Sequence, residues 1–203
     1  MPTRTRSSAS VSCIAAYGGS LDFLDTFKPA NQTKYCKGAE SVRRCYTGKA
    51  PTLRTVSSAY GENIAELWLT SQLKDLSEFS GSREKLSVEQ LDELARIINA
   101  DFSGFRVTEL MHFFSLFKAG HYGRFYGAVD GLAITEALQE FRRERDNLLW
   151  EESRKREKER RAKEEAIRAK EVMTFDEWKE LRHLFNFGYE PWRIKREKSA
   201  DAI

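Results

Sequence analysis

Apolar residues recur at three- and four-residue steps through the middle of the chain, and this period restricts the possible folds more than any other feature. The first apolar set is Ile64, Leu67, Trp68, Leu69, Leu73, Leu76 and Phe79, and the second is Leu91, Leu94, Ile97, Ile98 and Phe102. Each set falls on one face of a helix, whereas a strand would alternate with a period of two. No useful stretch shows that alternation. The sequence therefore predicts an all-α protein.

Signals that start and stop helices subdivide this apolar region. Residues 52–61 carry a first short helix, which ends at a glycine. Residues 87–90, Ser-Val-Glu-Gln, match a capping box, in which the serine and the glutamine side chains satisfy early backbone N–H groups. A helix that begins at or just before Thr108 is apolar on most sides, so we expect it to be the buried central helix. Asp130 is the predicted N-cap of the next helix, and the compact helical core is predicted to span residues 51–147.

A long charged helix is predicted to follow the core at residues 148–172. Residues 151–170 contain nine Lys or Arg and six Asp or Glu, but few apolar side chains. Acids precede bases by four residues in the pairs Glu151–Lys155 and Glu157–Arg161, the orientation that stabilises an isolated helix. The apolar heptad positions of a coiled coil are missing, so we interpret the segment as a solvated spacer. Residues 173–203 are predicted to form a short C-terminal helix and a basic tail.

Residues 1–50 differ from the core in composition. They hold eight Lys or Arg against three Asp or Glu, and they show no sustained apolar period. We therefore expect a basic, loosely structured N-terminal arm. Its one apolar cluster, Leu21, Phe23, Leu24 and Phe27, predicts a single short helix that docks on the core.

The overall charge and the cysteine count limit the cellular compartment and the class of partner that can be expected. The chain carries a formal charge of +3, which does not by itself indicate nucleic acid. No stretch approaches the ~18 consecutive apolar residues of a membrane span, so no membrane partner is expected. Cys13, Cys36 and Cys45 are odd in number, which argues against a disulfide framework. The apolar residues 11–17 are too short and too interrupted for a signal peptide, and we expect a cytoplasmic protein.

No set of residues in the sequence indicates catalysis or a cofactor. His112, His121 and His183 stand in no metal-binding spacing, and Cys36 and Cys45 do not form the paired knuckle of a zinc site. The acidic residues fall at helical positions that normally face solvent. We therefore expect no metal, no cofactor and no enzymatic activity.

Residues 120–127, Gly-His-Tyr-Gly-Arg-Phe-Tyr-Gly, are the most distinctive part of the sequence. They lack the preceding strand and the terminal Gly-Lys-Ser/Thr of a phosphate-binding loop. One interpretation is a tight connection between two helices, in which Tyr122, Phe125 and Tyr126 close the end of the core. The alternative is a surface platform on which the same rings contact a base or a partner side chain, with charge supplied by Arg124.

The block Tyr-Gly-Arg-Phe-Tyr-Gly at residues 122–127, with Ala59-Tyr60-Gly61, residues 75–79 and Glu109-Leu110, resembles an uncharacterised family of bacterial proteins. The resemblance covers residues 50–145, about half of the chain, and implies an association with mobile or phage-like elements. That family has no established activity, so no catalytic residues are implied. A small helical domain followed by a long charged helix is also similar, in architecture only, to phage replication proteins that load or restrain a helicase.

These observations predict a non-catalytic adaptor or accessory protein that binds another protein, in DNA replication or in the maintenance of a mobile element. The residues expected to contact the partner are Tyr122, Arg124, Phe125, Tyr126, Trp178 and Trp192. The alternative is direct binding of nucleic acid by the basic arm and the charged helix. The residues expected to contact phosphates in that case are Lys118, Arg124, Arg154, Lys155 and Arg156.

Overall fold

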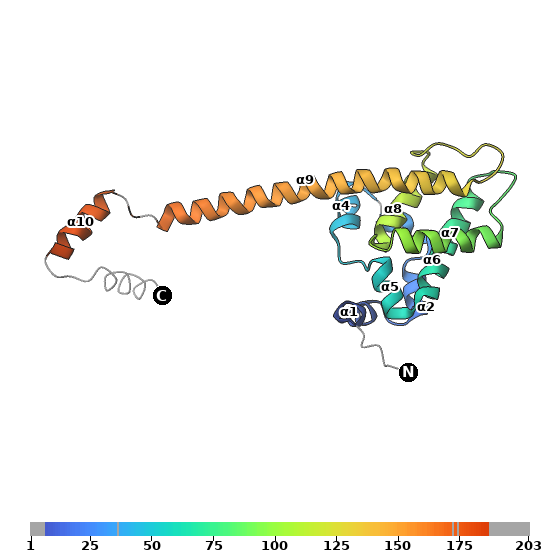
Figure 1. Cartoon of the computed structure of the whole chain (residues 1–203), viewed down its shortest axis with the longest axis horizontal. Coiled ribbons are helices and arrows are strands. Elements are labelled where there is room, and N and C mark those ends of the chain that lie inside the picture. Colours follow the sequence, from blue (N-terminus) through green and yellow to red (C-terminus); the bar gives the residue numbers. More distant parts are fainter. Residues whose placement is uncertain (1–6, 36, 172, 174, 187–203) are drawn as a thin grey trace. The chain divides into compact units, whose positions relative to one another are not determined.

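The computed structural model describes residues 7–35, 37–171, 173 and 175–186, and within them the protein is all-α, as predicted (Figure 1). The helices are α1 (Ser8–Tyr17), α2 (Ser20–Thr26), the 3-10 helix η1 (Pro29–Asn31), α3 (Gln32–Tyr35), α4 (Ala39–Thr47), α5 (Leu53–Tyr60), α6 (Glu62–Phe79), α7 (Val88–Asp101), α8 (Val107–Lys118), α9 (Gly131–Glu171) and α10 (Phe175–Asn186). Extended pairing in the described residues is limited to two isolated bridges, Thr52 with Arg106 and Glu84 with Ala128.

The chain divides into two compact units, residues 1–149 and 150–203. From the sequence, the core is predicted to end at residue 147. The first unit contains α1 to α8 and the start of α9, whereas the second contains the charged part of α9 and α10. Among the described residues, no helix is both long enough and apolar enough to cross a membrane.

The N-terminal region forms several helices where the sequence analysis expects a loosely structured arm. Residues 8–47 carry α1 to α4, and the rings of Phe23 and Phe27 are fully buried in the core. The Phe27 carbonyl accepts hydrogen bonds from Trp68 Nε1 at 2.7 Å and from Gln72 Nε2 at 2.9 Å. The expected docking helix corresponds to α2. Further helices surround it because the buried positions are spread over short segments that show no common period.

Three predicted helix starts are confirmed by side-chain hydrogen bonds. Thr52 caps α5 by accepting a backbone N–H three residues further on, at 3.2 Å. Ser87 Oγ accepts the N–H of Gln90 at 3.2 Å, and the Ser87 N–H donates to Gln90 Oε1 at 2.8 Å, which completes the capping box of α7. Asp130 Oδ1 accepts the N–H of Leu132 at 2.8 Å where α9 begins. Each bond satisfies a donor that the first turn of a helix leaves unpaired.

Helix α8 is the central helix of the first unit, as predicted. Nine of its twelve residues are buried. The ring of Phe113 lies 5.6 Å from that of Phe141 in α9, between centroids. Burial of a Phe side chain contributes about 1.5–3 kcal/mol, so a helix with Phe113, Phe114 and Phe117 buried supplies much of the driving force for packing this unit.

A buried ion pair joins α8 to α9. The Glu109 carboxylate is fully buried and accepts hydrogen bonds from Arg145 Nε at 2.9 Å and from the Arg106 N–H at 2.6 Å. The Arg106 guanidinium donates in turn to the carbonyls of Tyr46 at 3.3 Å and Ala50 at 2.7 Å. Burial raises the pKa of Glu109, and this effect outweighs the hydrogen bonds from Arg145 and Arg106, which lower it. One carboxylate therefore connects three segments of the first unit.

The charged part of α9 is stabilised by pairs along its own surface. Glu157 accepts hydrogen bonds from Arg160 Nε at 3.0 Å and from Arg161 Nε at 2.9 Å, so the predicted pairing of Glu157 with Arg161 is confirmed. The bonds from Arg160 and Arg161 lower the pKa of Glu157 to about 2. Such pairs support a helix that has no apolar face to bury.

Candidate functional site

The loop between α8 and α9, residues 119–130, is fixed by its backbone at both ends. Gly120 and Gly127 have φ angles of 85° and 86°, which residues with a Cβ rarely adopt. The Gly127 carbonyl accepts the N–H groups of Arg83 at 3.0 Å and Glu84 at 3.3 Å. The neighbouring loop between α6 and α7 therefore holds the far end of this loop in place.

Two aromatic rings of the loop face the core. The Tyr122 ring lies 5.4 Å from that of Phe113, and the Phe125 ring stacks on that of Phe117 at 5.1 Å. The Tyr122 hydroxyl donates to Glu144 of α9 at 3.2 Å. Burial, together with the Glu144 carboxylate, raises the pKa of Tyr122. Tyr122 and Phe125 thus anchor the loop and leave little of their surface for a partner.

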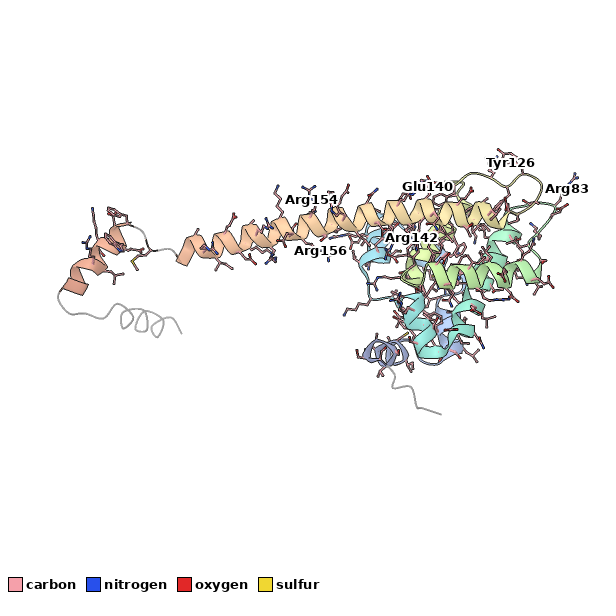
Figure 2. The ribbon with its side chains drawn as sticks, viewed as in Figure 1. Arg83, Tyr126, Glu140, Arg142, Arg154 and Arg156 are labelled. Atoms are coloured by element: carbon pink, nitrogen blue, oxygen red, sulfur yellow. The ribbon has the colours of Figure 1, made fainter. Side chains whose placement is uncertain are left out.

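Tyr126 is the exposed ring of the same loop. It is 93% exposed, and Figure 2 shows it pointing away from the core, with Arg83 exposed on the neighbouring loop. Arg124 is also exposed. Of the loop residues predicted to contact a partner, Tyr126 and Arg124 are therefore accessible. We call Arg83, Arg124 and Tyr126 the Tyr126 surface.

Lys118 is engaged within the fold. Its ammonium pairs with the Asp75 carboxylate, donates to Gln32 Oε1 at 3.0 Å and lies 5.6 Å from the centre of the Phe79 ring. The sequence analysis groups Lys118 with Arg124 as a phosphate contact. The structure instead directs Lys118 towards α3 and α6, whereas Arg124 faces solvent.

The basic residues of the charged helix do not share one face. Arg154 and Arg156 leave opposite sides of α9 in Figure 2, and the Arg154 guanidinium lies 4.7 Å from the centre of the Trp150 ring. Lys155 is exposed between them in the sequence. The three cations predicted to contact phosphates therefore point in different directions around the helix.

The second unit presents aromatic rings on α10. Phe175 is 67% exposed and Trp178 is 45% exposed, and their rings stack at 5.8 Å. The Lys179 ammonium lies 4.7 Å from the centre of the Phe175 ring, and the Arg182 guanidinium lies 5.0 Å from that of Trp178. We call these four residues the α10 aromatic face. Trp192, the other predicted contact in this region, lies outside the described residues.

A groove between α7 and the start of α9, of about 810 Å³, is a feature that the sequence analysis missed. Its apolar lining is Leu86, Leu94, Ile97, Phe102 and Leu132. Its acidic lining is Glu89, Glu93, Asp101, Asp130 and Glu136, and none of the described residues that line it is Lys, Arg or His. We call it the acidic groove. In the sequence, the groove is indicated by Leu132, an apolar residue of α9 that lies outside the set of apolar residues facing the core.

A second concavity, of about 410 Å³, lies in the N-terminal region. Its aromatic wall is Tyr17, Phe27 and Tyr35, and its cationic residues are Lys34, Arg44 and Lys49. The Phe27 and Tyr35 rings stack at 5.6 Å. We call it the basic cavity. All three cations belong to the positive excess that the sequence shows in residues 1–50, and the fold gathers them around aromatic rings.

The titratable side chains of the first unit form no metal cluster. Within the described residues, no group of three or more His, Cys, Asp or Glu is placed to hold a metal ion. His112 is buried, and its Nδ1 has no hydrogen-bond partner. Its ring meets that of Tyr46 edge to face at 5.9 Å. Burial lowers the pKa of His112, and the nearby His121 lowers it further, so His112 is a neutral core residue at pH 7.

The chain matches a known protein family. Residues 85–186 match a family described as a family of unknown function, DUF6633. The matched region is half of the chain and includes the loop at 119–130, the acidic groove and α10. No curated protein and no solved structure matches the chain.

Proposed function

The chain belongs to the DUF6633 family, whose function is unknown, and we propose that it is a cytoplasmic, non-catalytic adaptor that binds a partner protein through the Tyr126 surface. The observation that supports this most is the contrast within one loop. Tyr126 is almost fully exposed, while Tyr122 and Phe125 on either side of Arg124 are fixed against the core. The resemblance noted in the sequence suggests DNA replication or mobile-element maintenance as the setting.

A fixed, exposed tyrosine is an efficient contact residue for another protein. Tyr offers a large, rigid side chain that loses little conformational entropy on binding. Tyr and Arg are also the residue types that dominate binding energy at interfaces. The hydrogen bonds to the Gly127 carbonyl fix the backbone beside Tyr126 against the loop that carries Arg83, so little backbone ordering is left to be done on binding.

Photo-crosslinking tests the adaptor proposal directly. p-Benzoylphenylalanine would replace Tyr126 in the full chain and, as a matched control, Leu21, which is 79% exposed in the same unit. Crosslinking in the native host should give a defined protein adduct from position 126 and none from position 21. Arg124→Ala should weaken the adduct. Equal, diffuse labelling from both positions would contradict the proposal.

The basic cavity favours direct binding of nucleic acid as the second candidate function. Aromatic rings stack on bases, and Lys or Arg beside them neutralise phosphates. The cavity offers both through Tyr17 and Tyr35 with Lys34, Arg44 and Lys49. On this second candidate, the basic N-terminal region would make the contact, and Lys118 would not, because its charge is engaged by Asp75.

Fluorescence anisotropy with a labelled single-stranded oligonucleotide tests this second candidate. Binding should weaken steeply between about 50 mM and about 200 mM salt. Arg44→Glu should abolish it, whereas Arg96→Glu, which reverses an exposed charge on α7, should leave it nearly unchanged. No binding at about 50 mM salt would remove the candidate. A nuclease-sensitive adduct from position 126 would instead move the nucleic-acid contact to the Tyr126 surface.

A further inference from the structure

We propose that the acidic groove receives the α10 aromatic face of a second copy of this chain, so that the protein assembles with itself. The inference takes up Trp178, which the sequence predicts as a partner contact, and names its partner. It does not use the Tyr126 surface, so the two proposals can fail separately.

Part of the apolar lining of the groove is open to solvent, whereas Leu86, Leu94 and Phe102 are buried. On its α9 side Leu132 is 73% exposed, and on its α7 side Ile97 is partly exposed. A Cβ added to Gly131 would lie 3.8 Å from Leu94 Cδ2, so α9 approaches α7 closely at this point. Helix-binding grooves have this form, with apolar residues from two helices on either side of a shallow channel.

The rim of the groove is negatively charged. Glu93 pairs with Arg96 at 3.5 Å, but both side chains are exposed, and such a pair contributes little. Glu89 accepts a hydrogen bond from the Ser87 hydroxyl at 2.8 Å and keeps its charge, because hydrogen bonds at the start of α7 lower its pKa. Glu136 is exposed on the opposite side of the groove. An apolar ligand with positive charge at its edges fits this rim.

The α10 aromatic face has the complementary character. Phe175, Trp178, Lys179 and Arg182 are spaced i, i+3, i+4 and i+7, so they share one side of the helix. The acids of α10, Asp176, Glu177 and Glu180, fall on the other side by the same spacing. The side that would enter the groove is therefore aromatic and cationic, although the helix as a whole is not basic.

A second copy, and not the same chain, is the assigned source of the helix. Docking of α10 into the groove of its own chain is the alternative occupant, and sedimentation separates the two, because an intrachain contact would leave the protein monomeric at every concentration. Each copy carries one groove and one α10 aromatic face. Two copies that exchange their α10 helices would occupy both grooves and close a symmetric dimer.

Sedimentation velocity of the full chain over a range of concentrations tests the proposal. The wild type should shift from monomer to dimer as its concentration rises. Leu132→Asp in the groove and Trp178→Asp on α10 should each weaken association by at least about tenfold. Leu21→Asp, a control at another exposed leucine, should not. Both test positions are exposed, so the first unit should keep its fold, and circular dichroism at 222 nm should show no loss of helix beyond that of α10.

Mixing the two variants separates this arrangement from other dimers. The Leu132→Asp copy keeps its α10 aromatic face, and the Trp178→Asp copy keeps its groove. An equimolar mixture can form one of the two interfaces and should associate more strongly than either variant alone. A wild type that stays monomeric at every concentration would overturn the proposal. So would a dimer that neither variant weakens, or a mixture no better than its components.

Discussion

Replacement of Glu109 by alanine should destabilise the first unit by about 3–5 kcal/mol, the cost of breaking a buried ion pair on one side. Alanine leaves two donors without their acceptor, the Arg106 N–H and the Arg145 guanidinium, whose side chain is only 19% exposed. A buried donor left unpaired costs about 1–3 kcal/mol, and more when it is charged. The two losses together come to about 2–6 kcal/mol, a range that includes the cost of breaking the pair.

Two further variants at this pair separate charge from hydrogen bonding. Glu109→Gln keeps an acceptor oxygen, and burial already favours the neutral form, since it raises the pKa of Glu109. We therefore expect Glu109→Gln to cost about 1–3 kcal/mol, less than alanine. The double variant Glu109→Met/Arg145→Met removes both charges, so its cost should fall below the sum of the two single changes.

Urea unfolding measures these differences. Trp68 is fully buried in the first unit, and it is one of four tryptophans in the chain. A background with Trp150, Trp178 and Trp192 changed to Phe leaves Trp68 as the only fluorescent reporter. With an m value of about 2 kcal/mol/M, a loss of about 3–5 kcal/mol lowers the midpoint by about 1.5–2.5 M.

A matched control decides the result. Glu140 also lies on α9 but is exposed (Figure 2), so Glu140→Ala should leave the midpoint nearly unchanged. If Glu109→Ala moved the midpoint no further than Glu140→Ala, the buried pair would not hold α8 to α9 and the reasoning from burial would be refuted.

Three smaller effects follow from local structure and pH. Ser87→Ala should cost about 1 kcal/mol by removing the cap of α7; an unchanged urea midpoint would contradict this. Gly123→Ala should cost about 1–2 kcal/mol because its φ is 93°, whereas Gly104→Ala, which has ordinary φ and open space at Cβ, should not destabilise. Burial lowers the pKa of His112, so as the pH falls through the unfolded value of about 6.5 the unfolded state takes up this proton before the folded state does. Stability should therefore fall as the pH falls from about 7.5 to about 5.5, and His112→Phe should flatten that slope in urea midpoints measured at both pH values.

Local signals in the sequence predicted the helices of the core well. The capping box at Ser87 and the cap at Asp130 are confirmed because each depends only on residues within three positions along the chain. The buried α8 is confirmed because its apolar residues fill almost every position. Phe23 and Phe27 show what local signals cannot predict, since their burial depends on Trp68 and Gln72, which lie far away in the sequence.

The candidate site was only partly predictable, because a loop has no period that separates inside from outside. Tyr122 and Tyr126 lie in similar sequence surroundings, each next to a glycine. The first packs against Phe113 and the second is exposed, and only the fold of the loop on α8 and α9 decides which. The acidic groove was missed for a related reason. Its acids look like the solvated faces of two separate helices until α7 and α9 come together.

The exposed rings of α10 are connected with the proposed self-association through the stability of this helix. Helix α10 has twelve residues, and an isolated helix of this length is only marginally stable in water. Its stacked rings, Phe175 and Trp178, contribute little hydrophobic stabilisation while they remain exposed. Burial of the same rings in the groove of a second copy would stabilise the interface and the helix at once. On the dimer proposal, self-association would therefore add to the stability of α10, because the groove of a second copy would supply the apolar surface that an exposed α10 lacks.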